Sequence, residues 1–420
     1  MTSPFLQAAA VACCTLMLGT ASAEENALSL AAAGQYALNN HPALAAHPAQ
    51  RSTQKALAQG AALSPPPSVE FSLEDFAGSG NSSGSDGAQA TLSLSQVLEL
   101  GGQRARRQER AESATALLST EQEVQRRDIL AAVAAHFVET LAQQHRLELA
   151  KNGLQLAQRM ESAVQSRVDA AAAPAAERIR AAVVRAEAEL ELEDQEHRLQ
   201  TQRMALAEAM GMPKPRFGSL RGALFTTEPS QGFEALMASI DKSPALLRLI
   251  SRERLAQSEL MLARSRARGE LRASLGIRQR QVSDDTAWVA GLSLPLFSAK
   301  QAAPGIAAKQ AEVEALGFEQ QASRNAIQAQ LFALDQEMRH AQHVLGVLDS
   351  TILPALDQAL ALTEAAYREG RYSWLQLQEI QEQLRSARLR RIAAAEEFHL
   401  QRIEIERLSG LPIRLQEAQS

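Results

Sequence analysis

One pattern of residues occurs twice in this chain, and this internal repeat restricts the possible folds more than any other feature. The spacing between matched segments is nearly constant, at 202, 198 and 199 residues. The matched pairs are NHPALAAH (40–47) with KSPALLRL (242–249), LSQVLE (94–99) with LSLPLF (292–297), and MGMP (210–213) with SGLP (409–412). We therefore divide the chain into a leader at 1–23, a first repeat at 24–212, a linker at 213–241, a second repeat at 242–412 and a short tail at 413–420.

Each repeat predicts a helix, a strand, a loop, a strand, a very long helix, a break and another helix. The predicted helices are 42–63, 102–168 and 174–210 in the first half, and 244–268, 302–369 and 373–408 in the second. The long helices would each extend roughly 100 Å at about 1.5 Å per residue, and the two shorter ones could stack end to end beside them. Leu377, Ile380 and Leu384 begin an apolar period near 3.5, which suits a coiled-coil filament and a tube of helices equally.

Four segments alternate between apolar and polar residues as strands do: 68–76, 90–100, 270–280 and 287–297. A β-barrel with lipid outside and water inside produces this alternation, and so does a half-buried sheet in a soluble protein. Known membrane barrels start at about eight strands. If these four strands form a barrel, several copies of the chain must share it.

The first 23 residues predict a secretory signal cut before Glu24, because an apolar run of about twelve residues is closed by Ala21-Ser22-Ala23. A buried helix of the mature domain is the alternative. Both cysteines of the chain, Cys13 and Cys14, lie in this leader, so a mature chain has no thiol; lipid attachment at Cys13 stays open. Beyond the leader, no segment has the ~18 consecutive apolar residues of a membrane-spanning helix.

The composition argues against several classes of function. A formal charge of −5 gives no bias toward nucleic acid, and an aromatic content of 4% with much Ala, Leu, Gln, Glu and Arg favours long helices. The sequence shows no catalytic nucleophile pattern or phosphate-binding loop, so we predict no enzyme and no cofactor. His340 and His343, three residues apart, could share a metal ion, although such a pair on an exposed helix is more often solvated.

In combination, these features resemble the TolC-like outer-membrane factors, the trimeric ducts of tripartite export systems. The resemblance rests on the twofold repeat, the strand ending in LSQVLELGGQR with its partner LSLPLF, the segment YREGRYSWLQL (367–377), and the GMP and GLP that close the halves. It implies a mainly α fold with a β-barrel: a homotrimer in which four strands per chain form a shared 12-stranded barrel, joined to a long periplasmic α-helical barrel.

Within that family the chain looks most like the cobalt-zinc-cadmium and copper efflux branch, although Val97 stands where proline is usual and Gln103 where lysine is usual. The resemblance implies an outer-membrane exit duct of an RND-type system in a Gram-negative bacterium, exporting heavy-metal cations. Its implied partners are a periplasmic adaptor, an inner-membrane RND pump and outer-membrane lipid. Export of drugs or proteins is the alternative; a periplasmic adaptor or a coiled-coil structural protein fits the repeat less well.

The resemblance also implies roles for particular residues. Gly101 and Gly102 would form the bend from barrel to helix, and 213–241 would be an equatorial linker. The loops 77–88 and 283–286 would face the outside of the cell. A periplasmic constriction would involve Gln376 and Glu379, of which only the second is acidic. The adaptor would dock at two helix tips through Asp169, Pro174, Tyr367, Gly370 and Ser373; Ala170 departs from the glycine usual in the first tip.

Overall fold

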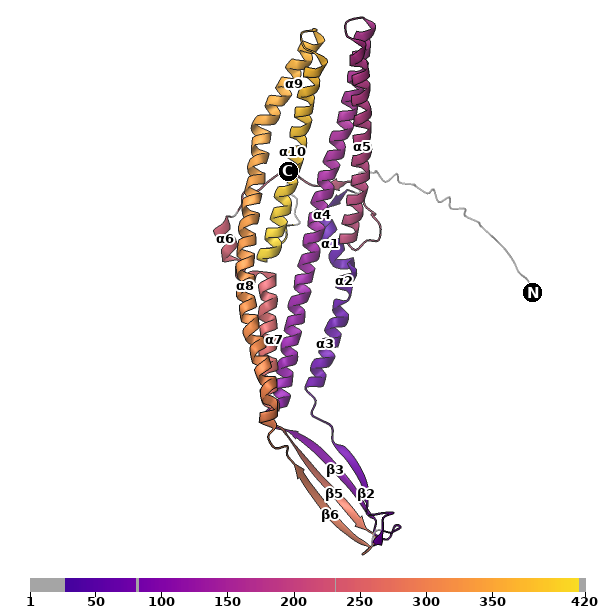
Figure 1. Ribbon diagram of the computed structural model, residues 1–420, viewed down its shortest axis with the longest axis vertical. Helices are drawn as coiled ribbons and strands as arrows, with labels where there is room; N and C mark the ends of the chain where they lie inside the picture. The colour runs from indigo at the N-terminus through magenta and orange to yellow at the C-terminus, as the bar shows by residue number, and fades with distance from the viewer. Residues whose placement is uncertain (1–26, 81–82, 231, 415–420) are drawn as a thin grey trace, which may run out of the picture.

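The structure is a computed structural model that describes residues 27–80, 83–230 and 232–414. The predicted leader, with Cys13, lies outside the described residues. Figure 1 shows a long rod of helices that carries two helical hairpins at one end and a four-stranded sheet at the other. In chain order the elements are β1 (Leu28–Ser29), α1 (Leu30–Asn40), α2 (Pro42–Ala45), α3 (His47–Ala61), β2 (Ser68–Glu74), β3 (Gln89–Glu99), α4 (Gln103–Asp169), α5 (Ala175–Ala209), β4 (Leu220–Arg221), α6 (Phe233–Ala238), η3 (Ile240–Lys242), α7 (Pro244–Arg266), β5 (Glu270–Arg280), β6 (Asp285–Ser293), α8 (Ser298–Val347), η4 (Leu348–Ile352), α9 (Leu353–Arg368) and α10 (Trp374–Ser409).

The predicted helices 102–168, 174–210, 244–268 and 373–408 are confirmed to within two residues at each end. Two predictions differ from the structure. The helix expected at 42–63 is broken at Ala46, because Pro48 favours a fresh helix start. The helix expected at 302–369 begins four residues earlier, at Ser298, and contains the five-residue π-helical turn η4. Its early start also shortens β6, which ends at Ser293 rather than at 297.

The shorter helices stack end to end beside the long ones, as the sequence predicted. Figure 1 shows α7 and α10 in line alongside α8, and α3 alongside the end of α4 that adjoins the sheet. In both halves, the ends of the two stacked helices lie in close contact. A Cβ atom added to Gly211 would lie 2.8 Å from His41 Cα, and one added to Gly410 would lie 2.2 Å from the carbonyl oxygen of Lys242. The two repeats therefore form the same joint.

The four-stranded sheet has the order β2-β3-β5-β6, and every neighbouring pair is antiparallel. Its central pair joins the two repeats, with Leu94 opposite Leu275 in register. In the described residues β2 and β6 each have one strand neighbour, so both outer edges of the sheet are unpaired. The sheet alone cannot close on itself within one chain.

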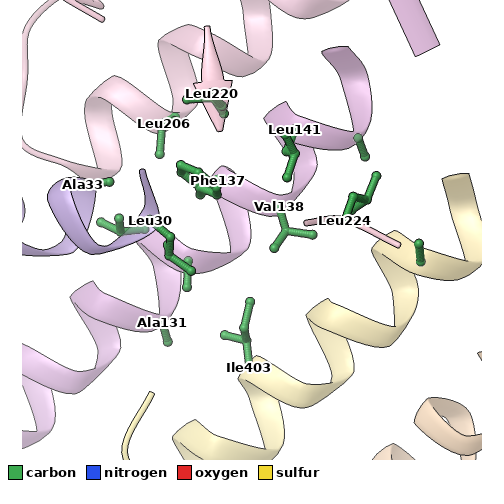
Figure 2. Packing of buried hydrophobic residues seen from close by; sticks show 14 of the residues in the cluster. Leu30, Ala33, Ala131, Phe137, Val138, Leu141, Leu206, Leu220, Leu224 and Ile403 are labelled. Atoms are coloured by element: carbon green, nitrogen blue, oxygen red, sulfur yellow. The ribbon is translucent and has the colours of Figure 1, made fainter. Parts of the chain in front are cut away.

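The largest core lies midway along the rod, where both repeats meet. Figure 2 shows Leu30 of α1, Phe137 of α4, Leu206 of α5 and Ile403 of α10 around one packed centre. The sequence prediction missed α1, which begins at the Ser29 cap and buries Leu30, Ala33 and Ala37 here. It also missed the small parallel pair of β1 with β4.

The linker at 213–241 is fastened to α8 and α10 by buried polar groups. Ser230 donates a hydrogen bond to the fully buried Asp335 at 2.6 Å, and His399 Nε2 lies 2.9 Å from the carbonyl oxygen of Leu224. Burial, together with nearby Arg402, lowers the pKa of His399 to about 4. The imidazole is therefore neutral at neutral pH and donates its Nε2 proton to the linker carbonyl.

By length and composition, one stretch of described residues could cross a membrane as a helix: Ser298–Arg368, the whole of α8, η4 and α9. Two acidic residues in this stretch argue for a place in the rod instead. Asp349 and Asp357 form ion pairs with Arg391 and Arg388 of α10. Only 11% of the apolar window in this stretch is buried within one chain.

Candidate functional site

The two faces of the four-stranded sheet differ sharply in chemistry. One cross-strand row consists of Phe71, Leu92, Ile277 and Trp288, which are paired in register and 44–75% exposed. Neighbouring cross-strand rows extend the same apolar face of the sheet. The further exposed apolar residues of this face are Val69, Leu73, Leu94, Leu98, Leu275 and Leu292. A continuous exposed apolar face of this kind is what a lipid-facing sheet presents.

The opposite face of the sheet is polar and internally hydrogen-bonded. Arg278 Nε donates to Thr91 Oγ1 at 3.0 Å, and its Nη1 donates to Gln89 Oε1 at 3.3 Å. Farther along, the hydroxyl oxygens of Ser68 and Ser95 lie 2.8 Å apart. These groups suit contact with water, so the alternation predicted from the sequence separates a lipid-compatible face from a hydrated one.

The change from sheet to helix occurs where the glycines were expected. Gly101 and Gly102 both have φ of 73°, and Gly102 caps α4. A Cβ on Gly101 would lie 2.7 Å from Arg268 Cδ, so a larger residue is excluded by space as well as by backbone conformation. Next to them, the buried Gln103 donates from Nε2 to the carbonyl oxygen of Gly269 at 3.0 Å. In the second repeat, Phe297 takes the left-handed conformation instead, with φ of 61°.

The two helix tips have the same turn. Ala171 N–H donates to the Val168 carbonyl at 2.9 Å, just as Gly370 N–H donates to the Tyr367 carbonyl at 3.0 Å. Ala171 has φ of 54° and Gly370 has φ of 77°, so the first tip places an alanine where glycine is favoured. The residue in this position is Ala171, one place beyond Ala170. Asp169 ends α4, and Pro174 caps α5.

A small hydrophobic cluster joins the two tips. Its buried members come from all four helices at the tips, α4, α5, α9 and α10: Val164, Ala181, Tyr367, Trp374 and Leu377. The rings of Tyr367 and Trp374 pack edge to face with centroids 6.2 Å apart. Tyr367, expected at a docking surface, is thus 3% exposed and mainly packed between the hairpins.

The two residues expected at a constriction have different surroundings. Gln376 occupies the third position of α10 and completes a capping box, because its Oε1 accepts from Ser373 N–H at 2.9 Å. Glu379 is exposed one turn farther along α10. The role of either residue in a constriction stays a prediction, since a single chain does not show what lies opposite them.

The histidine pair considered for metal binding lies on an exposed face of α8. Across residues 27–80, 83–230 and 232–414, no group of three or more His, Cys, Asp or Glu side chains is placed to hold a metal ion. Sequence reasoning missed Arg167 and Trp374, which join the tips. Trp374 carried a usable signal, since it is one of only two tryptophans in the chain; Arg167 carried none.

Comparison with known proteins identifies the fold. Residues 33–212 match the family model described as outer membrane efflux protein. The chain is 28% identical over 390 residues to the cobalt-zinc-cadmium resistance protein CzcC of Cupriavidus metallidurans, with 92% of this chain and 89% of that protein covered.

Solved structures agree. The outer membrane protein VceC of Vibrio cholerae superposes with a TM-score of 0.74 at 16% identity, over 91% of this chain and 96% of VceC. CusC, described as forming a transmembrane channel, gives 0.73 at 13% identity, over 91% and 92%. The predicted TolC-like fold and the resemblance to outer-membrane efflux proteins are confirmed, and so is the interpretation that the chain is not an enzyme.

Proposed function

We propose that three copies of this chain, which has the fold of outer-membrane efflux channels, form an exit duct for heavy-metal cations across the outer membrane of a Gram-negative bacterium. The shared sheet would form a twelve-stranded barrel in lipid, and the helical rods would form a tunnel in the periplasm. A periplasmic adaptor would dock at the two tips and link the duct to an inner-membrane RND pump.

The observation that carries this proposal is the sheet, whose one face is apolar and exposed while both of its edges are unpaired. Unpaired backbone groups are too costly to leave in lipid, so the edges must find partners. The strand β6 of one copy can pair with β2 of the next, and three copies supply twelve strands. That number lies within the range of closed membrane barrels, whereas four strands do not.

The helices support the same assembly. In a single chain, α5 exposes four large apolar residues at helical spacing: Ile179, Val183, Leu190 and Met204. The apolar window of Ser298–Arg368 is also largely exposed. Neighbouring copies arranged around an axis would cover these surfaces, since each rod would then have a neighbour on both sides.

The cargo is proposed from the relatives. CzcC is named for resistance to cobalt, zinc and cadmium, and the match extends over most of both chains. Glu379 supports a cationic cargo, because a ring of three exposed carboxylates attracts cations. Export of drugs or proteins is the competing function.

A deletion strain tests this proposal. Cells that lack the chain should accumulate more zinc, cobalt or cadmium after loading, as measured by inductively coupled plasma mass spectrometry, and the parent gene should restore the lower level. A variant with Leu92→Arg, which puts a charge on the lipid-facing row, should fail to restore it. Unchanged metal content together with new sensitivity to dyes or antibiotics would assign the duct to drug export instead.

A further inference from the structure

The second long helix contains a π-turn that the first lacks. Across η4 the Leu353 N–H donates to the carbonyl of Leu348, five residues back, rather than four. Pro354 follows directly and has no N–H to donate to the turn before it. In the first repeat, α4 runs through 67 residues as continuous α-helix.

Burial along the two helices shows that this π-turn holds one extra residue. On the barrel side of η4, buried positions match at a spacing of 198 residues. The matched pairs are Leu331 with Val133, Asp335 with Phe137, Met338 with Thr140, and Ala341 with Gln143. At the tips the spacing is 199, since Gly370 corresponds to Ala171. A π-turn accommodates one inserted residue in a helix, so the insertion and the turn coincide.

The helix is firmly held just before the turn and at the first two residues of the turn. Leu345 and Leu348 are 3% and 2% exposed in the core. Asp349, within the turn, accepts two hydrogen bonds from Arg391 of α10, at 2.6 and 3.3 Å. The Arg391 guanidinium in turn lies 3.8 Å from the centroid of the Phe225 ring in the linker. Three segments of the chain therefore fix this level of the rod.

The tip side of the turn is loosely packed against the first hairpin. A cavity of about 540 Å³ separates the hairpins and is lined by Leu156 and Met160 on one side and by Leu360 and Leu384 on the other. Trp374 and Gln381 also line it, and their Nε1 and Nε2 donors are buried without a hydrogen-bond partner among the described residues. Beyond the cavity, the hairpins meet again in the tip cluster.

We propose that η4 is the hinge on which the α9–α10 tip moves away from the α4–α5 tip, a proposal that rests on the duct function above. The helix α10 is continuous at this level, so the paired helices can bend only if α8–α9 changes length relative to α10. Conversion between one π-turn and regular α-helix supplies that change. The cavity leaves fewer side-chain contacts between the hairpins to break when the tips separate. The uninterrupted α4 keeps the first hairpin straight.

Deletion of Ser350, an exposed residue of the turn, tests the hinge. It removes the extra residue and leaves the packed residues of α8 and α9 on either side of the turn unchanged. Spin labels at Ala172→Cys and Arg371→Cys report the distance between tips, with labelled chains diluted among unlabelled ones. The parent should show a short and a long distance population, and the deletion should lose the long one. Ser350→Ala, which keeps the length of the turn, should behave as the parent. A folded deletion variant that retains both populations would overturn the hinge.

Hydrogen exchange on the unaltered protein provides a test that does not depend on folding of the deletion. Amides of 348–358 should exchange at least about tenfold faster than those of 149–159 on α4, because local opening is concentrated at the hinge. Equal protection would overturn the proposal. Planar-bilayer conductance separates the two hypotheses: a parent protein that forms no channel contradicts the duct, whereas a conducting parent with equal protection contradicts only the hinge.

Discussion

Arg167 at the end of α4 joins the two hairpin tips through Tyr367. Its Nη1 donates to the main-chain carbonyl of Tyr367 at 2.8 Å, and the guanidinium carbon lies 4.5 Å from the centroid of the Tyr367 ring. Burial raises the pKa of the Tyr367 phenol, so the ring stays neutral. One side chain of the first repeat thus makes two contacts with the second.

Replacement of Arg167 with Ala should favour separation of the tips. A hydrogen bond from a charged donor and a cation–π contact together contribute about 1–3 kcal/mol, and about 1.4 kcal/mol changes an equilibrium tenfold. We expect a rise of about tenfold in the open probability of single channels in planar bilayers. Arg178→Ala, at an exposed position of α5, is the matched control. Equal open probability in the two variants would show that the contact does not hold the tips.

The two tip turns should respond in opposite directions to exchange of alanine and glycine. Ala171→Gly should stabilise its turn and Gly370→Ala should destabilise its own, each by about 1 kcal/mol, because both positions have positive φ. A Cβ on Gly370 would meet nothing within 4 Å, so steric contact adds nothing to the second effect. Exchange rates of the amides that close each turn measure both changes. If the exchange rates changed in the same direction in both variants, the expected preference for glycine at these positive-φ positions would be contradicted.

Mutations of Gln376 and Glu379 should have different effects, because the first residue caps a helix and the second is expected to attract cations. Gln376→Ala removes half of a capping box, so we expect a loss of about 1 kcal/mol in helix stability and little effect on cation block. Glu379→Gln should raise the concentration of divalent cation that blocks the channel about fivefold, for about 1 kcal/mol of lost attraction in a hydrated pore. Block that is unchanged in Glu379→Gln would place the constriction elsewhere.

The strands, the long helices and the repeat were predictable because each leaves a period in the sequence. Alternation put Phe71 and Leu92 on one face and Glu70 and Thr91 on the other, and the structure has these faces. Gly101 was predictable because a sharp bend between regular elements favours glycine. The Ser373–Gln376 cap also follows a known pattern, Ser-x-x-Gln, so this part of the candidate site could have been found from the sequence.

Other features had no local signal. The π-turn is marked by no residue type, and the extra residue emerges only when burial is compared between the two repeats. The link between Arg167 and Tyr367 spans 200 positions, and its geometry depends on how two separately specified hairpins pack. The helix α1 was missed because its alanines look like an extension of the leader.

Stability should depend on pH through His399. Its pKa is lowered to about 4 in the folded chain, so between about pH 6.5 and 4 the unfolded chain takes up a proton that the folded chain does not. Stability therefore falls as the pH drops through this window, by up to about 3 kcal/mol per chain. Nearby Glu406, whose pKa burial raises, acts in the opposite direction.

Thermal unfolding at pH 7.5, 6.0 and 4.5 isolates this contribution when the parent is compared with His399→Gln. The difference between their midpoints should narrow as the pH falls, since only the parent loses the stability of a neutral imidazole. A constant difference across the three values would mean that His399 does not titrate in this window.

If three chains share one barrel, the mass of the intact complex tests this most directly. Native mass spectrometry of the protein released from detergent micelles should give three times the mass of one mature chain. A complex of one chain, stable in detergent and still able to conduct ions in a planar bilayer, would contradict the shared barrel and the duct built on it.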